Sequence, residues 1–262
     1  MNLRPIAAAQ KAQGPGTLYL VPTPLDFGCD SLAPLDDVLP QATIARAAAL
    51  QHWVCENAKS ARAFLKRVGE VSPLCATIQT QQLQELPREV HKKGDTGFDA
   101  RSLLAPALQG HDMGLLSEAG MPAIADPGAA VVRAAHTLGI EVVPLVGPVS
   151  LMLALAASGL NGQNFAFVGY VPSEPVSRAQ RIKALEVLAL KTGQTQLFIE
   201  TPYRNEALLR TLLEVLQAST RLAVSMGLTL GSCRHYSGTA QEWKRTNWVL
   251  NNQTPAVFAI GP

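Results

Sequence analysis

Three loops that follow predicted strands carry the residues most able to bind a ligand. The first, LLSEAGMPAIADPG (115–128), places two glycines, two prolines and two carboxylates just before a predicted helix. A strand, a glycine turn and a helix start expose backbone N–H groups that bind anions or nucleotides. The stretch has neither the Walker A pattern nor GxGxxG, so phosphate binding is poorly supported. The structural alternative is that Asp126 only caps the helix and Gly120 only shapes the turn.

Two further loops repeat this arrangement of a strand followed by small or polar residues. GPVS (147–150) brings a glycine and a proline to the start of a predicted helix, and ETPYR (200–204) brings charge directly after a strand. The GPVS turn also predicts a boundary between residues 16–147 and residues 148–262. Clefts between α/β halves are common ligand sites, so the loops of the two halves are expected to face each other.

The apolar runs predict the elements that must position these loops. Eight runs predict strands, several of them apolar throughout, as in sheets covered on both faces: 17–21, 52–56, 113–117, 141–145, 165–169, 196–200, 221–225 and 256–260. Helical spacing predicts a surface helix over 204–217, and another that begins at Asp126 and Pro127 and ends at Gly139. Residues 72–98 show no clear pattern. The alternation predicts an α/β fold.

The composition excludes several classes of protein. The chain has 262 residues, 47% hydrophobic and 16% charged, which is typical of globular proteins and not of disordered chains. Its net charge of +2 predicts no polyanionic partner by itself, but residues 148–262 carry 10 Lys and Arg against 6 Asp and Glu. This excess indicates either an anionic ligand or an ordinary solvated surface. The four cysteines are scattered and form no CxxC motif, which predicts a reducing, cytoplasmic setting without disulfides or metal. Residues 1–15 are predicted to form a flexible leader.

One uncharged segment, Val142 to Ser173, is long enough to span a bilayer. Five Pro and Gly residues divide it into a short strand, a helix of about three turns and a second strand. We therefore expect a buried central helix and no membrane span.

Five motifs, in their order along the chain, resemble those of the ribosomal small-subunit RNA methyltransferase I family. They are PTP (22–24), SEAGMPAIADPG, VVPLVGPVS with ALAASGL, FVGYVP (167–172) and ETPYR. That family is a branch of the tetrapyrrole methylases, which depend on S-adenosylmethionine. The resemblance implies a homodimer of two-domain α/β chains, each domain a mixed sheet flanked by helices, with the cofactor in the cleft between domains. It also implies 2′-O-methylation of a cytidine in 16S ribosomal RNA.

The resemblance further implies which residues hold the cofactor and which do chemistry. The cofactor site would comprise Pro22, Leu25, Ala119, Gly120, Met121, Ile124, Gly147, Pro148, Val149, Ser150 and Ala256. A ribose hydroxyl as nucleophile would be helped by a general base or a positioned cation, and the candidates are Glu56, Lys59, Glu118, Glu200 and Arg204. Glu56 could instead cap a helix, and Glu200 could instead pair with Arg204. Tyr203 could stack on a base or only pack its turn.

Several departures from the family fall on the polar residues expected to meet substrate. The relatives read Ala-Glu-Asp-Thr-Arg where this chain has CENAK (55–59), and SDAGTP where it has SEAGMP. Their Arg-Glu-Leu-Thr-Lys is MGLTL (226–230) here, which removes three charges. Losing cations should weaken contacts with phosphates. A tetrapyrrole or other small-molecule substrate, or a cofactor-binding paralogue with little activity, therefore stays open as an alternative.

Overall fold

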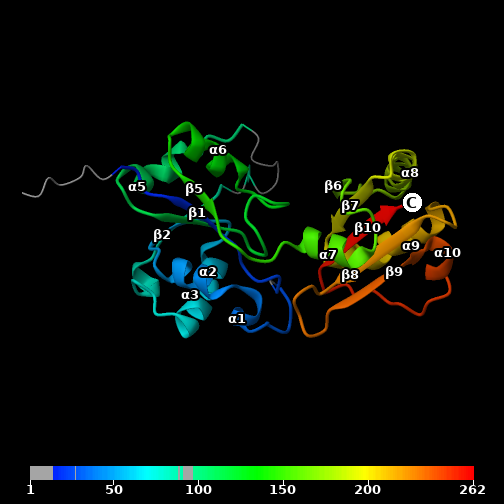
Figure 1. Ribbon diagram of the computed structural model, residues 1–262, viewed down its shortest axis with the longest axis horizontal. Helices are drawn as coiled ribbons and strands as arrows, with labels where there is room; N and C mark the ends of the chain where they lie inside the picture. Colours follow the sequence, from blue (N-terminus) through cyan, green and yellow to red (C-terminus); the bar gives the residue numbers. More distant parts are fainter. Residues whose placement is uncertain (1–13, 27, 88, 91–96) are drawn as a thin grey trace, which may run out of the picture.

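The structure is a computed structural model that describes residues 14–26, 28–87, 89–90 and 97–262. Most of the predicted leader lies outside these residues. The described chain forms two five-stranded sheets, each flanked by helices, that lie side by side along the long axis of the molecule (Figure 1). Residues 145–149 lie between β5, the last strand of the first sheet, and α7, the first helix of the second half.

The N-terminal half contains the first sheet. Its elements are β1 (Leu18–Val21), α1 (Leu35–Val38), α2 (Gln41–Ala48), β2 (His52–Cys55), α3 (Ala58–Val71), η1 (Ile78–Thr80), β3 (Gln82–Glu85), η2 (Arg101–Leu104), α5 (Ala105–Leu108), β4 (Met113–Leu116), α6 (Ala129–Thr137) and β5 (Val142–Pro144). The strand order is β3-β2-β4-β1-β5, and every described pair is parallel. The expectation of a mixed sheet is therefore wrong for this half, because each strand returns through a helical crossover.

The centre of this sheet explains its apolar runs. All four residues of β4 are buried, with α1 to α3 on one face of the sheet and α5 and α6 on the other (Figure 1). Trp53 of β2 packs so closely over Gly114 of β4 that a Cβ there would collide with its ring. Gln81 accepts the buried indole N–H at 2.8 Å. A glycine in mid-strand thus makes room for the largest core side chain.

The C-terminal half contains the second sheet. Its elements are α7 (Ser150–Ser158), β6 (Phe165–Tyr170), α8 (Pro175–Thr192), β7 (Thr195–Glu200), η3 (Pro202–Arg204), α9 (Asn205–Val215), β8 (Arg221–Met226), β9 (Arg234–Thr239), α10 (Ala240–Trp243) and β10 (Ala256–Gly261). The order is β6-β7-β10-β8-β9, with β6 and β7 parallel and the other pairs antiparallel. This sheet is mixed, as the sequence predicts.

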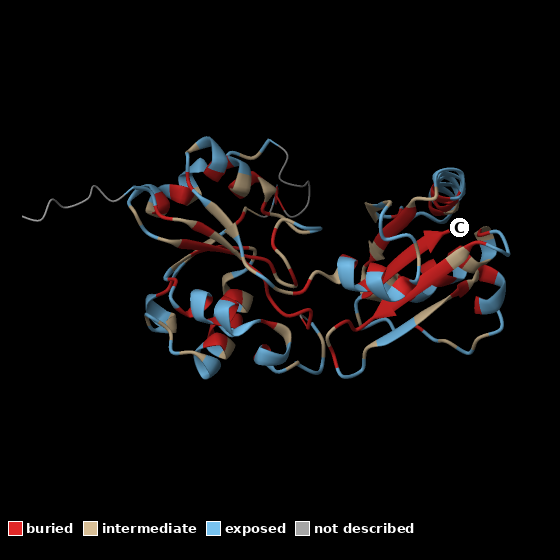
Figure 2. Ribbon diagram, viewed as in Figure 1, coloured by how far each residue is buried: buried red, intermediate tan, exposed pale blue. Residues whose placement is uncertain are grey.

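The uncharged segment folds as a strand, a helix and a strand, as predicted, but its helix is not fully buried. Leu151, Ala154 and Leu155 of α7 pack on the sheet, whereas Met152 and Leu153 are 41% and 40% exposed. Figure 2 shows α7 with both buried and exposed stretches along its length. A single helix on one face of a sheet can bury only one of its own faces. No helix in the described part of the chain is long and apolar enough to cross a membrane.

Candidate functional site

Two hollows lie next to each other where strands of both sheets end. We call the first the N-terminal pocket; its volume is about 430 Å³, and it is lined by residues that follow β1, β2 and β4 together with α3. The second, the central cavity, has a volume of about 240 Å³ and is lined by residues from both halves. Because β1, β2 and β4 are parallel, their carboxyl ends meet at one edge, where α/β proteins bind ligands.

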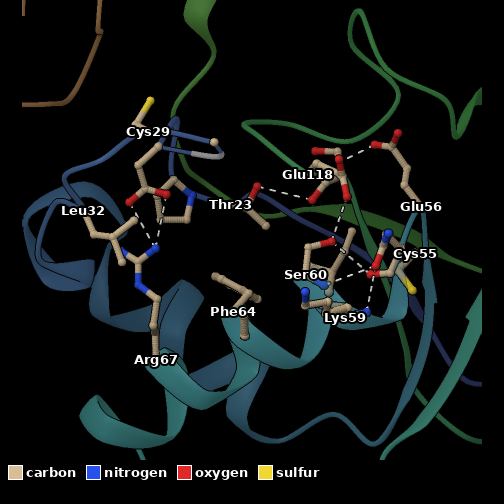
Figure 3. A pocket seen from close by; sticks show the side chains of 18 residues that line it. Thr23, Cys29, Leu32, Cys55, Glu56, Lys59, Ser60, Phe64, Arg67 and Glu118 are labelled. Carbon is tan, nitrogen blue, oxygen red and sulfur yellow. Dashed lines mark hydrogen bonds and ion pairs between the residues drawn. The ribbon is translucent and has the colours of Figure 1, made fainter. Parts of the chain in front are cut away.

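The N-terminal pocket brings together three of the five candidates for a general base or positioned cation (Figure 3). Glu118, Glu56 and Lys59 all line it. The Ser60 hydroxyl donates to Glu118 Oε1 at 2.8 Å, and the backbone N–H of Glu118 donates to Glu56 Oε1 at 3.2 Å. The Glu118 carboxylate is therefore held in place by α3, and the loop that carries it is held by Glu56.

Glu56 does not cap the following helix. Asn57 is the N-cap of α3, and its side chain accepts from the backbone N–H groups of Lys59 and Ser60 at 2.8 and 3.4 Å. A short amide side chain reaches the first turn better than a glutamate one position earlier. Glu56 is thereby left to face the pocket.

A buried ion pair closes the other end of the pocket. Arg67 lies 3.0 Å from Asp26 Oδ2 and donates to the carbonyl oxygen of Ala33 at 2.7 Å. Both charged residues line the pocket, and the Asp26 side chain is only 6% exposed. Arg67 is thus fixed to the loop that follows β1, whereas Lys59 at the opposite end is exposed.

Most of the predicted cofactor residues line the central cavity, but three do not. Those on its wall are Leu25, Ala119, Gly120, Met121, Ile124, Val149, Ser150 and Ala256. Pro22, Gly147 and Pro148 lie behind the wall, where Gly147 packs so closely on Pro22 that a Cβ would collide with its ring. These three residues do not belong to the lining, although the Pro148 carbonyl oxygen would lie 3.4 Å from a Cβ at Gly120.

The loop from Glu118 to Gly128 forms one side of the central cavity in an unusual conformation. Gly120, Ala123, Ala125 and Gly128 all have positive φ, at 79°, 65°, 66° and 138°. Gly120 forms a two-way backbone bridge with Thr23, with both N···O distances 3.0 Å. A Cβ at Gly120 would lie 3.0 Å from Leu25 Cδ2. The two alanines store backbone strain, which is typical of binding loops.

Asp126 lines the central cavity and does not cap the helix that follows. The N-cap of α6 is Gly128, whose φ of 138° redirects the chain, so the helix begins at Ala129 and Pro127 lies outside it. Burial, and then the neighbouring charges of Glu56 and Glu118, raise the pKa of Asp126 to about 7. The end of this helix at Gly139, with φ 69°, is as predicted. Sequence analysis missed this site residue because an Asp before Pro at a helix start is usually structural.

Glu200 and Arg204 form the predicted ion pair at the opposite side of the cavity. Arg204 lies 2.6 Å from Glu200 Oε1, which also accepts from the backbone N–H of Thr201 at 2.7 Å. Glu200 lines the cavity, but Arg204 does not, so Arg204 positions a carboxylate instead of meeting a ligand there. Tyr203 is 67% exposed, with the Arg204 guanidinium over its ring.

The segment that replaces the relatives' charged motif is buried. Met226, Leu228 and Leu230 are 5%, 8% and 6% exposed, and Leu228 lines the central cavity. Thr229 between them has φ 69°, which is rare for a β-branched residue. An apolar turn therefore stands where the family resemblance implies charge.

Comparisons with known proteins decide the family. The sequence profile of the Tetrapyrrole (Corrin/Porphyrin) Methylases matches residues 41–243. The chain belongs to the tetrapyrrole methylase family. It is 32% identical over 191 residues to ribosomal RNA small subunit methyltransferase I of Pseudomonas aeruginosa, covering 72% of this chain and 58% of that relative. It is 30% identical over 239 residues to the Halalkalibacterium halodurans protein of the same name, covering 90% and 73%.

A solved structure supports the fold of this tetrapyrrole methylase. Uroporphyrin-III-C-methyltransferase from Thermus thermophilus matches with a TM-score of 0.51 and 18% identity, over 94% of both chains. At this identity the match shows the fold alone. The chain spans less than two thirds of the Pseudomonas relative's length, so activity, substrate and partners are matters for proposal.

Proposed function

We propose that this tetrapyrrole methylase transfers a methyl group from S-adenosylmethionine to a ribose hydroxyl of small-subunit ribosomal RNA, in the cytoplasm. The main support is the central cavity, whose walls are backbone loops and apolar side chains from both halves. It adjoins a polar pocket that holds Glu118, Glu56 and Lys59. The names of the curated relatives support ribosomal RNA as the substrate.

The residues of the central cavity fit S-adenosylmethionine. Gly120 leaves a gap that a Cβ would fill, and Glu200 offers a buried carboxylate oxygen with no hydrogen-bond partner among the described residues. These features suit a nucleoside with amino and hydroxyl donors better than a phosphate. Ala119, Met121, Ile124, Val149, Ser150 and Ala256 would supply the rest of the contact.

Methyl transfer then requires two things of the protein: alignment of the acceptor hydroxyl with the methyl group, and removal of the hydroxyl proton. The bound cofactor supplies a methyl group already activated by its sulfonium, so displacement depends chiefly on a collinear approach. Glu118, fixed by Ser60, is the candidate to accept the proton that the acceptor hydroxyl loses. Lys59 is an exposed cation in the lining of the N-terminal pocket, and it is the candidate to bind a phosphate of the acceptor strand.

The apolar turn at 226–230 favours a second candidate. Because the relatives' charges there are replaced by buried Met226, Leu228 and Leu230, methylation of a tetrapyrrole or another small molecule is the alternative. The third possibility, a cofactor-binding paralogue with little activity, would bind S-adenosylmethionine without transfer.

One experiment separates these functions. Cofactor labelled in its methyl group is incubated with the protein and with ribosomal subunits, total RNA or a tetrapyrrole panel. Label in RNA supports the first function, label in a small molecule supports the second, and binding by calorimetry without transfer supports the third. Absence of micromolar binding would contradict all three.

Gly120→Val tests the cavity as the cofactor site. The side chain would press on Leu25 and disturb the bridge to Thr23, so we expect an affinity loss of about ten-fold or more. Gly139→Val is the matched control, since Gly139 also has a left-handed φ of 69° but nothing lies within 4 Å of its Cβ position. Equal affinities in the two variants, at matched thermal stability, would show that the cofactor binds elsewhere.

A further inference from the structure

The charged side chains on the walls of the central cavity are all carboxylates. Asp126 comes from the N-terminal half and Glu200 from the C-terminal half, and no Lys, Arg or His of the described residues belongs to the lining. A hollow with acidic groups and low-dielectric walls attracts cations and disfavours anions. The charges on the cavity wall therefore favour a cationic ligand over an anionic one.

Glu200, on the wall of the central cavity, has one carboxylate oxygen that lacks a hydrogen-bond donor among the described residues. Its side chain is completely buried, and its Oε1 accepts from Arg204 and Thr201. Its Oε2 is buried without a hydrogen-bond partner among the described residues. Leaving a buried carboxylate oxygen unpaired is costly, so such an atom on the wall of a cavity indicates a ligand that completes it.

Asp126 lies within reach of charges from every element around it. Glu56 and Glu118 follow β2 and β4, and their negative charges act on it. Across the cavity are Tyr170 at the end of β6, Glu200 at the end of β7, and Arg204. Burial raises the pKa of Tyr170, and Asp126 and Glu200 raise it further, whereas Arg204 lowers it. Arg204 is held against Glu200, so Asp126 itself has no ion pair in the described structure.

We propose that Asp126 and Glu200 make the cavity selective for the positively charged methyl donor over its neutral product. S-adenosylmethionine carries a sulfonium, whereas S-adenosylhomocysteine carries an uncharged thioether and is otherwise alike. Asp126, which has no ion pair among the described residues, attracts the first, and Glu200, whose charge is partly balanced by Arg204, adds its unpartnered Oε2; neither gains from the uncharged sulfur of the second. Because methyl transfer removes the positive charge from the sulfur, the cavity binds the product more weakly than the donor. This inference rests on the proposed function and adds to it a basis for cofactor discrimination.

Calorimetry can measure proton release when the donor binds, without any turnover. A cation placed beside Asp126 favours its ionised form, so binding of the donor should expel the proton that Asp126 holds near neutral pH. Because the pKa of Asp126 in the ligand-free protein is about 7, roughly half a proton should be released at pH 7. The product should release clearly less, since its sulfur carries no charge.

The test is titration of the full chain with S-adenosylmethionine and with S-adenosylhomocysteine, at pH 7 in two buffers of different ionisation enthalpy. The proteins are wild type, Asp126→Asn, Glu200→Gln, and Asp36→Asn as a control in exposed α1. We expect proton release with the donor in wild type and in the control, and none in Asp126→Asn. The donor-to-product affinity ratio should fall roughly ten-fold in Asp126→Asn and also fall in Glu200→Gln.

The failures of the two proposals can be told apart. If wild type does not bind S-adenosylmethionine at all, the proposed function fails and this inference with it. If wild type binds it without releasing a proton, or if Asp126→Asn keeps the wild-type affinity ratio, charge selection is wrong while the methyl-donor site stands. Thermal unfolding of each variant shows whether a change in affinity reflects loss of fold.

Discussion

At the scale of single residues, Asp126 shows how a structural expectation and a site residue can share one sequence pattern. Asp before Pro at the start of an apolar helical run predicts an N-cap. The positive φ of Gly128 delays the helix, so the carboxylate faces the cavity without that partner. The sequence could not reveal this, because the φ of one glycine decides it.

Replacing Asp126 should stabilise the protein at high pH. Because the folded pKa of about 7 exceeds the unfolded value near 3.9, its charge opposes folding: the stability present below pH 4 is lost as pH rises through 7. Asp126→Asn should therefore match wild type at pH 4 and gain up to about 4 kcal/mol in the free energy of unfolding at pH 8, since the pKa shift is about three units. Urea denaturation at both pH values measures the difference. An equal effect at pH 4 and pH 8 would contradict the raised pKa.

The cysteines should differ in reactivity. Burial and the nearby charge of Glu85 raise the pKa of Cys55 to about 12, and burial also raises the pKa of Cys29 and Cys233. Cys75 is exposed. Since the thiolate is the reactive form, iodoacetamide at pH 8 should modify Cys75 first and Cys55 last. Peptide mapping by mass spectrometry gives the order, and early modification of Cys55 in the folded protein would show that its environment is wrongly described.

At the scale of elements, the strands that the sequence predicts are those with apolar runs. All eight appear within one or two residues of their expected bounds, but β3 (QLQE) and β9 (RHYSGT) were not predicted. Both are edge strands, so each pairs on one side only and carries polar, partly exposed residues. β3 and β9 lack the apolar signature because they bury less surface, and their polar side chains also protect against unwanted pairing, whereas the other two edge strands, β5 and β6, keep apolar sequences.

The N-cap of α3 links element stability to the site, since this helix holds Ser60 against Glu118. Asn57→Ala removes the side-chain acceptor for two backbone N–H groups and should cost about 1 kcal/mol in the free energy of unfolding. Asn57→Asp, the residue that the resembling family carries, should cost nothing because it keeps the cap and adds a favourable charge at the helix start. Chemical denaturation of both variants checks this. An Asn57→Ala variant as stable as wild type would mean that the cap contributes nothing.

At the scale of the whole molecule, α7 and α8 both expose large apolar side chains, and the exposed residues of α7 lie in a segment without charge. Met152 and Leu153 are two-fifths exposed, and Val146 just before the helix is 71% exposed, all within a segment without charge. Contiguous exposed apolar side chains of this kind mark interaction surfaces. The homodimer that the family resemblance implies predicts a contact between two copies of the chain at this face.

Charge placed on α7 should then separate the copies. Met152→Glu with Leu153→Glu would bury two carboxylates in the interface, so we expect the mass in solution to fall from dimer to monomer at micromolar concentration. Val187→Glu on α8 is the comparison, since Val187 is 60% exposed and lies in a helix that also exposes Leu188 and Leu190. Light scattering after size exclusion measures the mass. If the dimer persists in the α7 variant but dissociates in Val187→Glu, the interface lies on α8. If wild type is a monomer, the prediction of a dimer is wrong.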